Sequence, residues 1–157
     1  MNKSVSQDLH DYYKIDADKN KSIIYLSVKR LIDIIGSLTA IILLSPVFII
    51  IAIAIKVEDP KGTIFFSQER NGKYPKLFKM HKFRSMVHNA EELLETLKAD
   101  NEMSGPVFKM KEDPRITKVG KLIRKTSLDE LPQLFNILKG DMSFVGPRPP
   151  IPREVAL

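Results

Sequence analysis

Two adjacent carboxylates, Asp129 and Glu130, are the strongest candidates for chemistry in this sequence of 157 residues. Neighbouring carboxylates can hold Mg²⁺ on a diphosphate, and one of them can attack phosphorus as a nucleophile. Arg124 precedes the pair on the same segment, and Arg148 follows it on a later one. Because arginine can neutralise the non-bridging oxygens of a phosphate, this set indicates phosphoryl-type transfer at an anionic substrate.

A purely structural role for the same carboxylates stays open from the residues alone. Ser127 and Glu130 have the spacing of a capping box, and acidic side chains near a helix N-terminus stabilise it by roughly 0.3–1 kcal/mol. Pro132 argues against a cap at Ser127, since it would fall where an intrahelical donor is needed. A cap nearer Asp129 fits better and leaves at least one carboxylate for other work.

The segment 140–150 combines glycines with prolines around Arg148. Glycine freedom and proline rigidity suit a fixed loop that presents backbone donors and one arginine to an anion. A surface turn or a polyproline stretch that binds a partner is the alternative.

A second basic segment, 81–85, contains Lys82 and Arg84. They add further positive charge before the predicted amphipathic helix at 86–99. The simpler interpretation is a solvated patch or one that faces lipid headgroups.

An uncharged run from Ile34 to Ile55 must determine where these groups act. As a straight helix its 22 residues would reach roughly 33 Å, which is enough to span a bilayer. Ser45 and Pro46 interrupt the run near its middle, and proline both lacks a donor and clashes within a helix. Arms of about ten residues would each reach half the hydrocarbon depth, so a re-entrant hairpin is the alternative to a spanning helix. Basic residues at both edges of the run favour the hairpin.

Charge and composition limit the partners and the chemistry. Lys and Arg total 25 against 19 Asp and Glu, a net charge of +6, which favours lipid headgroups, nucleotide diphosphates or nucleic acid. The chain has no cysteine, so disulfides, thiolate zinc sites and cysteine nucleophiles are excluded. His10, His81 and His88 form no persuasive metal-ligand set.

The rest of the pattern predicts a mainly α fold with short β elements, α/β-like in kind. Residues 1–28 form a polar tail, 29–56 the membrane anchor, and 57–157 one small membrane-associated catalytic domain. A short hairpin or extended loop is expected at 63–66, and amphipathic helices at 86–99, 116–125 and 131–138.

Six ordered motifs resemble one protein family over the chain from Lys29 to its last residue. They read KRLID at 29–33, SP at 45–46, KFRSM at 82–86, DPRIT at 113–117, SLDELPQ at 127–133 and GDMSFVGPRP at 140–149. Together they resemble the bacterial sugar transferases, the monotopic polyprenyl-phosphate phosphoglycosyl transferases.

This resemblance implies a re-entrant helix broken at Ser45-Pro46, with both ends on the cytoplasmic face of the cell membrane. It implies transfer of a sugar-1-phosphate from a UDP-sugar to undecaprenyl phosphate, with release of UMP, as the first membrane step of exopolysaccharide, capsule or glycan biosynthesis. Asp129 matches the family nucleophile, which carries a covalent phosphosugar, and Glu130 completes a dyad that binds Mg²⁺.

The resemblance also implies that Arg124 and Arg148 bind phosphate, and it places Lys82 and Arg84 near the site. The expected partners are the UDP-sugar, undecaprenyl phosphate, membrane lipids and other proteins of polysaccharide assembly, but not nucleic acid. The chain ends where family members usually continue, so we expect that a C-terminal part is missing. An inactive truncated form or a noncatalytic membrane subunit of polysaccharide assembly is therefore the alternative, and a membrane-tethered nucleic-acid binder is a third, supported by charge alone.

Overall fold

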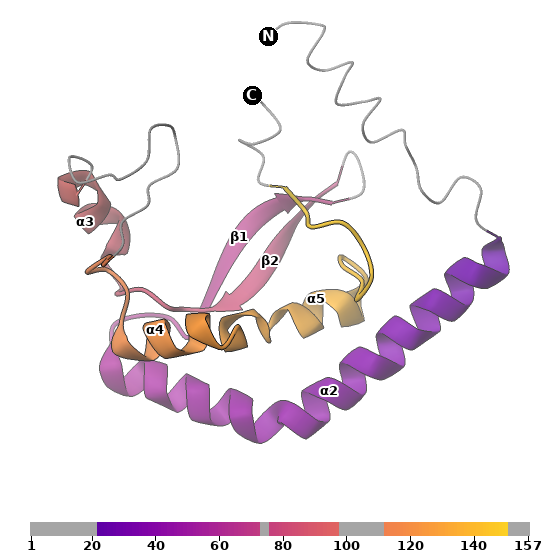
Figure 1. The fold of residues 1–157 in the computed structure, drawn as a ribbon, viewed down its shortest axis with the longest axis horizontal. Helices are drawn as coiled ribbons and strands as arrows, with labels where there is room; N and C mark the ends of the chain where they lie inside the picture. Colours follow the sequence, from indigo (N-terminus) through magenta and orange to yellow (C-terminus); the bar gives the residue numbers. More distant parts are fainter. Residues whose placement is uncertain (1–21, 73–75, 98–111, 151–157) are drawn as a thin grey trace, which may run out of the picture. The chain divides into compact units, whose positions relative to one another are not determined.

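The computed structural model describes residues 22–72, 76–97 and 112–150, and all structural statements below concern these residues. The elements, in chain order, are helix α2 (Ile23–Glu58), strands β1 (Phe65–Asn71) and β2 (Leu77–Phe83), helices α3 (Ala90–Leu97) and α4 (Lys118–Lys125), the 3₁₀ turn η2 (Leu128–Glu130) and helix α5 (Gln133–Lys139) (Figure 1). The predicted mainly α fold with short β elements is confirmed.

Helix α2 contains the whole predicted anchor and extends beyond it at its N-terminal end. Its mean hydropathy reaches 2.9 over an 18-residue window, and only 11% of that window is buried within the protein. Among the described residues it is the one helix that is long and apolar enough to cross a membrane. At about 1.5 Å per residue its 36 residues span about 54 Å, more than a hydrocarbon core requires. A membrane-associated protein is the conclusion these features support.

The predicted interruption at Ser45-Pro46 is not a gap in the helix. Helix α2 continues through Pro46 as one element. Proline at this position removes one backbone donor, and the helix continues on both sides of it. The predicted break at Ser45-Pro46 and the re-entrant path through a membrane stay predictions.

Contacts divide the described residues into two compact units, each built from segments that are not contiguous in the sequence. The first unit takes its described residues from 1–44, 67–81 and 132–157, and the second from 45–66 and 82–131. The division within α2 falls between Leu44 and Ser45, directly before the Ser45-Pro46 pair.

The second unit has the larger apolar core. Its buried residues are Ile51, Ile55, Phe83 and Ile123. Phe83 is 1% exposed and has the rings of Phe48 and Phe65 at centroid distances of 5.4 and 5.3 Å. The C-terminal half of α2 thus buries one face against the end of β2 and against α4, while its other face stays apolar and exposed.

Helix α4 begins where two side chains satisfy its free backbone donors. Glu58, the last residue of α2, accepts hydrogen bonds from the backbone N–H groups of Lys118 and Val119 at 2.7 and 2.9 Å. Thr117 accepts a third from Gly120 at 2.8 Å. An anionic side chain at a helix N-terminus is also favoured by the helix dipole.

In the first unit, Asn136 of α5 covers the open edge of β2. Its side-chain amide donates to the carbonyl of Lys79 at 2.8 Å and accepts from the N–H of His81 at 3.0 Å, so it acts as a substitute strand residue. Asn136 is 1% exposed. Helix α5 then ends at Gly140, whose φ of 100° is one that glycine adopts readily.

The predicted local elements are largely confirmed. The helices expected at 86–99, 116–125 and 131–138 correspond to α3, α4 and α5, each beginning two to four residues later than predicted, while part of the first range lies outside the described residues. Of the segment expected at 63–66, residues 65 and 66 begin β1, which runs on to Asn71 and forms a two-stranded sheet with β2. A hairpin was one of the two predictions for this region, but no range was predicted for its second strand.

Replacing Asn136 with leucine, Asn136→Leu, should lower the free energy of unfolding by about 3 kcal/mol. The change keeps the number and branching of the side-chain heavy atoms but leaves one buried donor and one buried acceptor of β2 without partners. Urea unfolding in detergent micelles measures this cost. Gln133→Leu, which removes an amide from the same helix, is the matched control, and equal losses in the two variants would contradict the assigned role of Asn136.

Candidate active site

The site is built around Lys82, whose ammonium group lies between the two adjacent carboxylates. Lys82 Nζ is 2.7 Å from Glu130 Oε1 and 3.9 Å from Asp129 Oδ2. Lys82 comes from β2, and both acids come from η2, so residues far apart in the sequence meet here. Asp129 is 9% exposed, whereas the Glu130 side chain is 47% exposed. One acid is therefore enclosed and the other faces solvent.

The backbone before the acids adopts an uncommon conformation. Ser127 has φ 58° and ψ 16°, the left-handed region, and it is the only described non-glycine residue with a positive φ. Such a conformation costs a non-glycine residue about 1 kcal/mol and is found most often at functional sites. It turns the chain sharply out of α4 and into η2.

The alternative roles of these acids as helix caps are wrong. Ser127 makes no side-chain cap bond, and helix α5 begins at Gln133 with Pro132 as its N-cap residue. The acids lie in a separate 3₁₀ turn before that helix. Pro132 decides this outcome, because it cannot donate within a helix and instead fixes the first turn of α5.

Asp129 has an environment that makes its ionised form less stable. Burial raises the pKa of Asp129 and the negative charge of Glu130 raises it further, while the charges of Lys82 and Arg124 lower it without cancelling the rise. A carboxylate that is poorly solvated and only partly neutralised is a stronger nucleophile and base than one in water. This environment makes Asp129 a candidate nucleophile.

Arg124 lies in the last turn of α4, and Ser85, in the segment after β2, holds its side chain. Its Nε donates to Ser85 Oγ at 2.8 Å, and its charge acts on both Asp113 and Asp129. The guanidinium is exposed, so its other donors can reach an anionic ligand. A phosphate-binding role for Arg124 stays a prediction.

A buried ion pair lies in the segment that precedes α4. Arg115 donates to Asp113 through Nε at 2.9 Å and Nη2 at 2.6 Å, and both side chains are at most 8% exposed. The bonds from Arg115 outweigh burial and lower the pKa of Asp113. In the sequence these two residues stand out only as part of the DPRIT motif. Their close spacing was the signal that could have indicated an ion pair.

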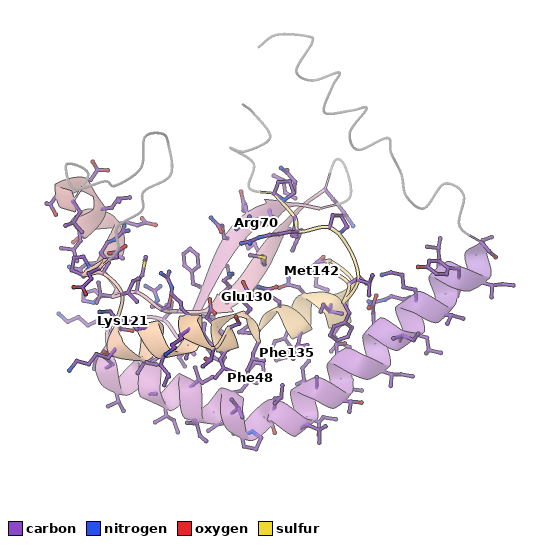
Figure 2. The ribbon with its side chains drawn as sticks, in the orientation of Figure 1. Phe48, Arg70, Lys121, Glu130, Phe135 and Met142 are labelled. Atoms are coloured by element: carbon purple, nitrogen blue, oxygen red, sulfur yellow. The ribbon has the colours of Figure 1, made fainter. Side chains whose placement is uncertain are left out.

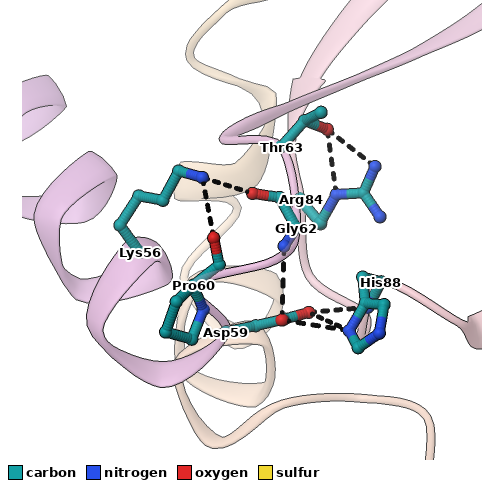
Figure 3. A network of polar contacts seen from close by, with 7 residues as sticks. All are labelled: Lys56, Asp59, Pro60, Gly62, Thr63, Arg84 and His88. Atoms are coloured by element: carbon teal, nitrogen blue, oxygen red, sulfur yellow. Dashed lines mark hydrogen bonds and ion pairs between the residues drawn. The ribbon is translucent and has the colours of Figure 1, made fainter.

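Arg84 is hydrogen-bonded to the segment before β1. Its Nε and Nη2 both donate to Thr63 Oγ1, at 3.1 and 2.7 Å (Figure 3). Arg84 therefore helps to hold the chain between α2 and β1. A role for Arg84 in binding substrate stays a prediction.

A second polar cluster in Figure 3 joins the end of α2 to the segment after β2. Asp59 accepts a 2.6 Å bond from the backbone N–H of His88 and lies 3.1 Å from the His88 ring Nδ1. Burial would raise the pKa of Asp59, but the bonds and charge of His88 lower it. His88 is thus the partner of a carboxylate, and among the described residues no group of three or more acids and histidines could hold a metal ion.

Arg148 belongs to the first unit. It lies on an exposed loop and makes no hydrogen bond or ion pair with another described residue. Its guanidinium is free to bind a ligand. The structure thus brings Lys82, Asp129 and Glu130 together, places Arg124 within electrostatic reach of Asp129, and leaves Arg148 as a separate cationic group.

Comparison with known proteins identifies the family. The sequence profile described as "Bacterial sugar transferase" matches residues 24–157, most of the chain. The chain belongs to the bacterial sugar transferase family. The match covers α2, the acids of η2 and the Arg148 loop.

Relatives from other bacteria agree. The chain is 48% identical over 132 residues to the undecaprenyl-phosphate galactose phosphotransferase of Salmonella typhimurium, an alignment that covers 82% of this chain and 27% of that protein. It is 47% identical over 126 residues to the galactosyl transferase CpsE of Streptococcus agalactiae, covering 80% and 28% of the two chains. The putative undecaprenyl-phosphate N-acetylgalactosaminyl 1-phosphate transferase of Bacillus subtilis is 46% identical over 128 residues, covering 82% and 65%. The chain thus spans between about a quarter and two thirds of these relatives.

Removing the positive charge beside the acids, with Lys82→Met, should raise the pKa of Asp129 further, because the charge of Lys82 now lowers it. Glu130→Gln should move the same pKa in the opposite direction, since it removes a neighbouring negative charge. Carbon-13 NMR titration of labelled aspartate measures both shifts, with the Asp129 signal assigned from its loss in Asp129→Asn. Lys79→Met, an exposed lysine on the same strand, is the control, and shifts of the same sign in Lys82→Met and Glu130→Gln would refute this electrostatic arrangement.

Breaking the buried pair with Asp113→Asn should lower the free energy of unfolding at neutral pH by about 3 kcal/mol. Because Arg115 lowers the pKa of Asp113 below its ordinary 3.8, the pair stabilises the fold above pH 3.8 and loses this effect as the pH falls through the lower, folded-state value. The difference between the two proteins should therefore shrink below pH 3.8. Thermal unfolding across pH tests this, with the exposed Glu112→Gln as control; a difference that persists unchanged in acid would contradict it.

Proposed function

We propose that this chain transfers a sugar-1-phosphate from a UDP-sugar to undecaprenyl phosphate through a covalent phosphosugar on Asp129. The observation that supports it best is the enclosed Asp129 with a raised pKa beside Lys82 and Glu130, in a chain of the bacterial sugar transferase family. The relatives named for phosphotransfer to undecaprenyl phosphate support the acceptor.

In the first step, a carboxylate oxygen of Asp129 attacks the phosphorus that bears the sugar. A new bond forms between that oxygen and phosphorus, the bridging bond of the diphosphate breaks, and UMP leaves with the bridging oxygen. An acyl phosphate that carries the sugar remains on Asp129. Its enclosure favours attack, because little hydration has to be removed from the nucleophile.

In the second step, a phosphate oxygen of undecaprenyl phosphate attacks the same phosphorus. The bond to Asp129 breaks, its carboxylate is regenerated, and the product is a lipid-linked diphosphate sugar. Two in-line displacements at one position allow a water-soluble donor and a lipid acceptor to be used in turn. Neither substrate has to wait for the other on the protein.

The neighbouring side chains have separate tasks in this scheme. The charge of Lys82 favours the ionised form of Asp129, and its 2.7 Å contact orients Glu130. Arg124 is placed to bind the leaving phosphate, because Ser85 holds its Nε and leaves the outer nitrogens available. Arg148 supplies a further cation for phosphate oxygens.

Magnesium fits this donor set only together with the substrate. Two carboxylates are too few for a protein-only site, but Mg²⁺ commonly binds one or two carboxylates along with substrate phosphates and water. Glu130, the exposed member of the pair, would hold the ion, with Asp129 as the second ligand. When bound, Mg²⁺ would neutralise charge on the diphosphate.

The anchor would place this chemistry at the cytoplasmic surface of the cell membrane. The exposed apolar faces of α2 supply the membrane affinity. In the proposed re-entrant path, both ends of the helix lie at the same membrane surface, and the chain turns back inside the bilayer near Pro46. A polyprenyl acceptor would then present its phosphate at headgroup height while its chain stays in lipid.

Incubation of the protein with each member of a UDP-sugar panel, in the absence of lipid acceptor, should produce a sugar-phosphate adduct on Asp129. Mass spectrometry of the tryptic peptide 126–139 detects it. In Asp129→Asn the adduct and UMP release should fall at least a thousandfold, because the amide is a far weaker nucleophile.

Glu69→Gln, an exposed acid on β1, is the control and should retain the adduct. An adduct that persists in Asp129→Asn would show that another residue is the nucleophile. UMP release without any adduct would show direct transfer, and the absence of both with every donor would refute the proposal for this chain.

A further inference from the structure

The loop that carries Arg148, residues 141–150, is exposed at its tip and attached at both ends. Val145 is 75% exposed, and nothing lies within 4 Å of a side chain built at Gly146. The residues on either side of this tip are held by α2 and by β1, respectively. The first unit contains this loop together with α5, the N-terminal half of α2, and residues 67–71 of β1 and 77–81 of β2.

The attachment to α2 centres on Asp33. Its Oδ1 accepts a hydrogen bond from the backbone N–H of Phe144 at 3.2 Å, and its Oδ2 lies 3.5 Å from Lys29 Nζ. Lys29 also donates to the hydroxyl of Ser143. Two residues one helical turn apart on α2 thus bind two consecutive residues of the loop.

Asp33 is a costly residue at this place. It is 5% exposed, and it sits at the edge of the uncharged run of a membrane-type helix. A buried carboxylate is tolerated only with charged or hydrogen-bonding partners, and ionisable residues in such helices usually serve a function. The partners of Asp33 lie in its own helix and in the Arg148 loop. The presence of this charge is explained by the loop that it holds.

One turn further along, Gly36 makes room for the same loop. A side-chain carbon built at Gly36 would lie 3.0 Å from the Phe144 ring, closer than such contacts normally allow. Phe144 therefore packs directly on the backbone of α2. Glycine in a helix interior costs up to about 1 kcal/mol relative to alanine, so this close approach explains its use here.

The attachment to β1 involves Arg70 and Asn71. Arg70 is 6% exposed; its Nη1 donates to the Pro149 carbonyl at 3.1 Å, and its Nη2 donates to Gln68 at 2.9 Å. The Asn71 N–H donates to the Pro150 carbonyl at 3.1 Å. In Figure 2, Arg70 extends from the strand toward the loop. The prolines lack N–H groups, and their carbonyls carry the attachment.

Arg30 fixes the helix that leads into the loop. Its two terminal nitrogens donate to the carbonyls of Ile137 and Leu138 at 2.7 Å each. These carbonyls lie at the C-terminal end of α5, where a positive charge is also favoured by the helix dipole. The start of the loop is thus tied to the same part of α2 as Phe144.

From this geometry we propose that Asp33 and Gly36 of α2, with Arg70 of β1, are positioning residues that hold the 141–150 loop so that Arg148 meets a phosphate group of the substrates. The membrane helix is then part of the binding site and more than a tether. The inference rests on the proposed function for its ligand. The ligand chemistry is a phosphate ester, either the diphosphate of the UDP-sugar or the phosphate of the polyprenyl acceptor.

Binding measurements on the full chain in nanodiscs test this inference, with UDP plus Mg²⁺ and undecaprenyl phosphate as separate probes. Arg148→Ala should weaken binding of one probe by about tenfold, as expected for loss of a charge-assisted hydrogen bond. Asp33→Ala and Gly36→Ala should each weaken binding of the same probe severalfold. The probe that responds identifies which phosphate Arg148 contacts.

The double variants distinguish positioning from general stability. If Asp33 acts through Arg148, then Asp33→Ala combined with Arg148→Ala should bind no more weakly than Arg148→Ala alone. Asp33→Asn keeps the acceptor for the Phe144 N–H and should retain part of the affinity. Thr39→Ala, at an exposed position on the same helix, is the control for Gly36→Ala, because both changes raise helix propensity.

Chymotrypsin provides a readout that needs neither activity nor ligand. Cleavage between Phe144 and Val145 should be slow in the native protein, and several times faster in Asp33→Ala and Gly36→Ala, but not in Thr39→Ala. Unchanged cleavage and unchanged affinity in these variants, with weakened binding in Arg148→Ala, would overturn the inference and leave the proposed function standing. If no sugar-phosphate adduct forms on Asp129, the expected proteolysis result is unchanged. Failure of the proposed function can therefore be distinguished from failure of this inference.

Discussion

The structure depends on how each buried carboxylate is neutralised. Asp113 is held by both arms of Arg115, and Asp59 by the backbone and ring of His88, and in both cases the partners lower the carboxyl pKa. Asp129 is the exception among these three: burial and Glu130 raise its pKa although Lys82 is close. Two of these acids are thus stabilised in the ionised form by their partners, whereas the ionised form of the third is disfavoured.

The sequence predicted the elements better than their partners. Helical spacing gave α3, α4 and α5, and the apolar run gave α2, because these signals are local. No range was predicted for strand β2, since the charge of Lys82 made its second half look like a surface patch, although Phe78 and Met80 alternate in the strand pattern. The acids of η2 were located as candidates, but their neighbour Lys82 could be assigned only through resemblance. Contacts such as Asp33 with Phe144 join residues more than a hundred positions apart, and no local pattern encodes them.

Several elements of this chain have two structural roles. The last residue of α2 caps α4, while the first half of the same helix binds the loop after α5. Asn136 closes the edge of a two-stranded sheet that would otherwise be marginal in water, and its backbone carbonyl also accepts bonds from the residues that begin the loop. Because so few residues form a core, polar contacts between distant segments carry much of the specificity of the fold.

The left-handed conformation of Ser127 restricts which sequences can retain this arrangement. Glycine or asparagine would adopt the same backbone angles readily, so exchange to either should be accepted during evolution. Valine or isoleucine would not, because their branched side chains collide with the backbone in that region. The backbone at position 127 would rotate to a negative φ to relieve the collision. The 3₁₀ turn η2 would then move Asp129 away from Lys82. A single backbone torsion at an exposed serine therefore limits the variation that the catalytic segment tolerates.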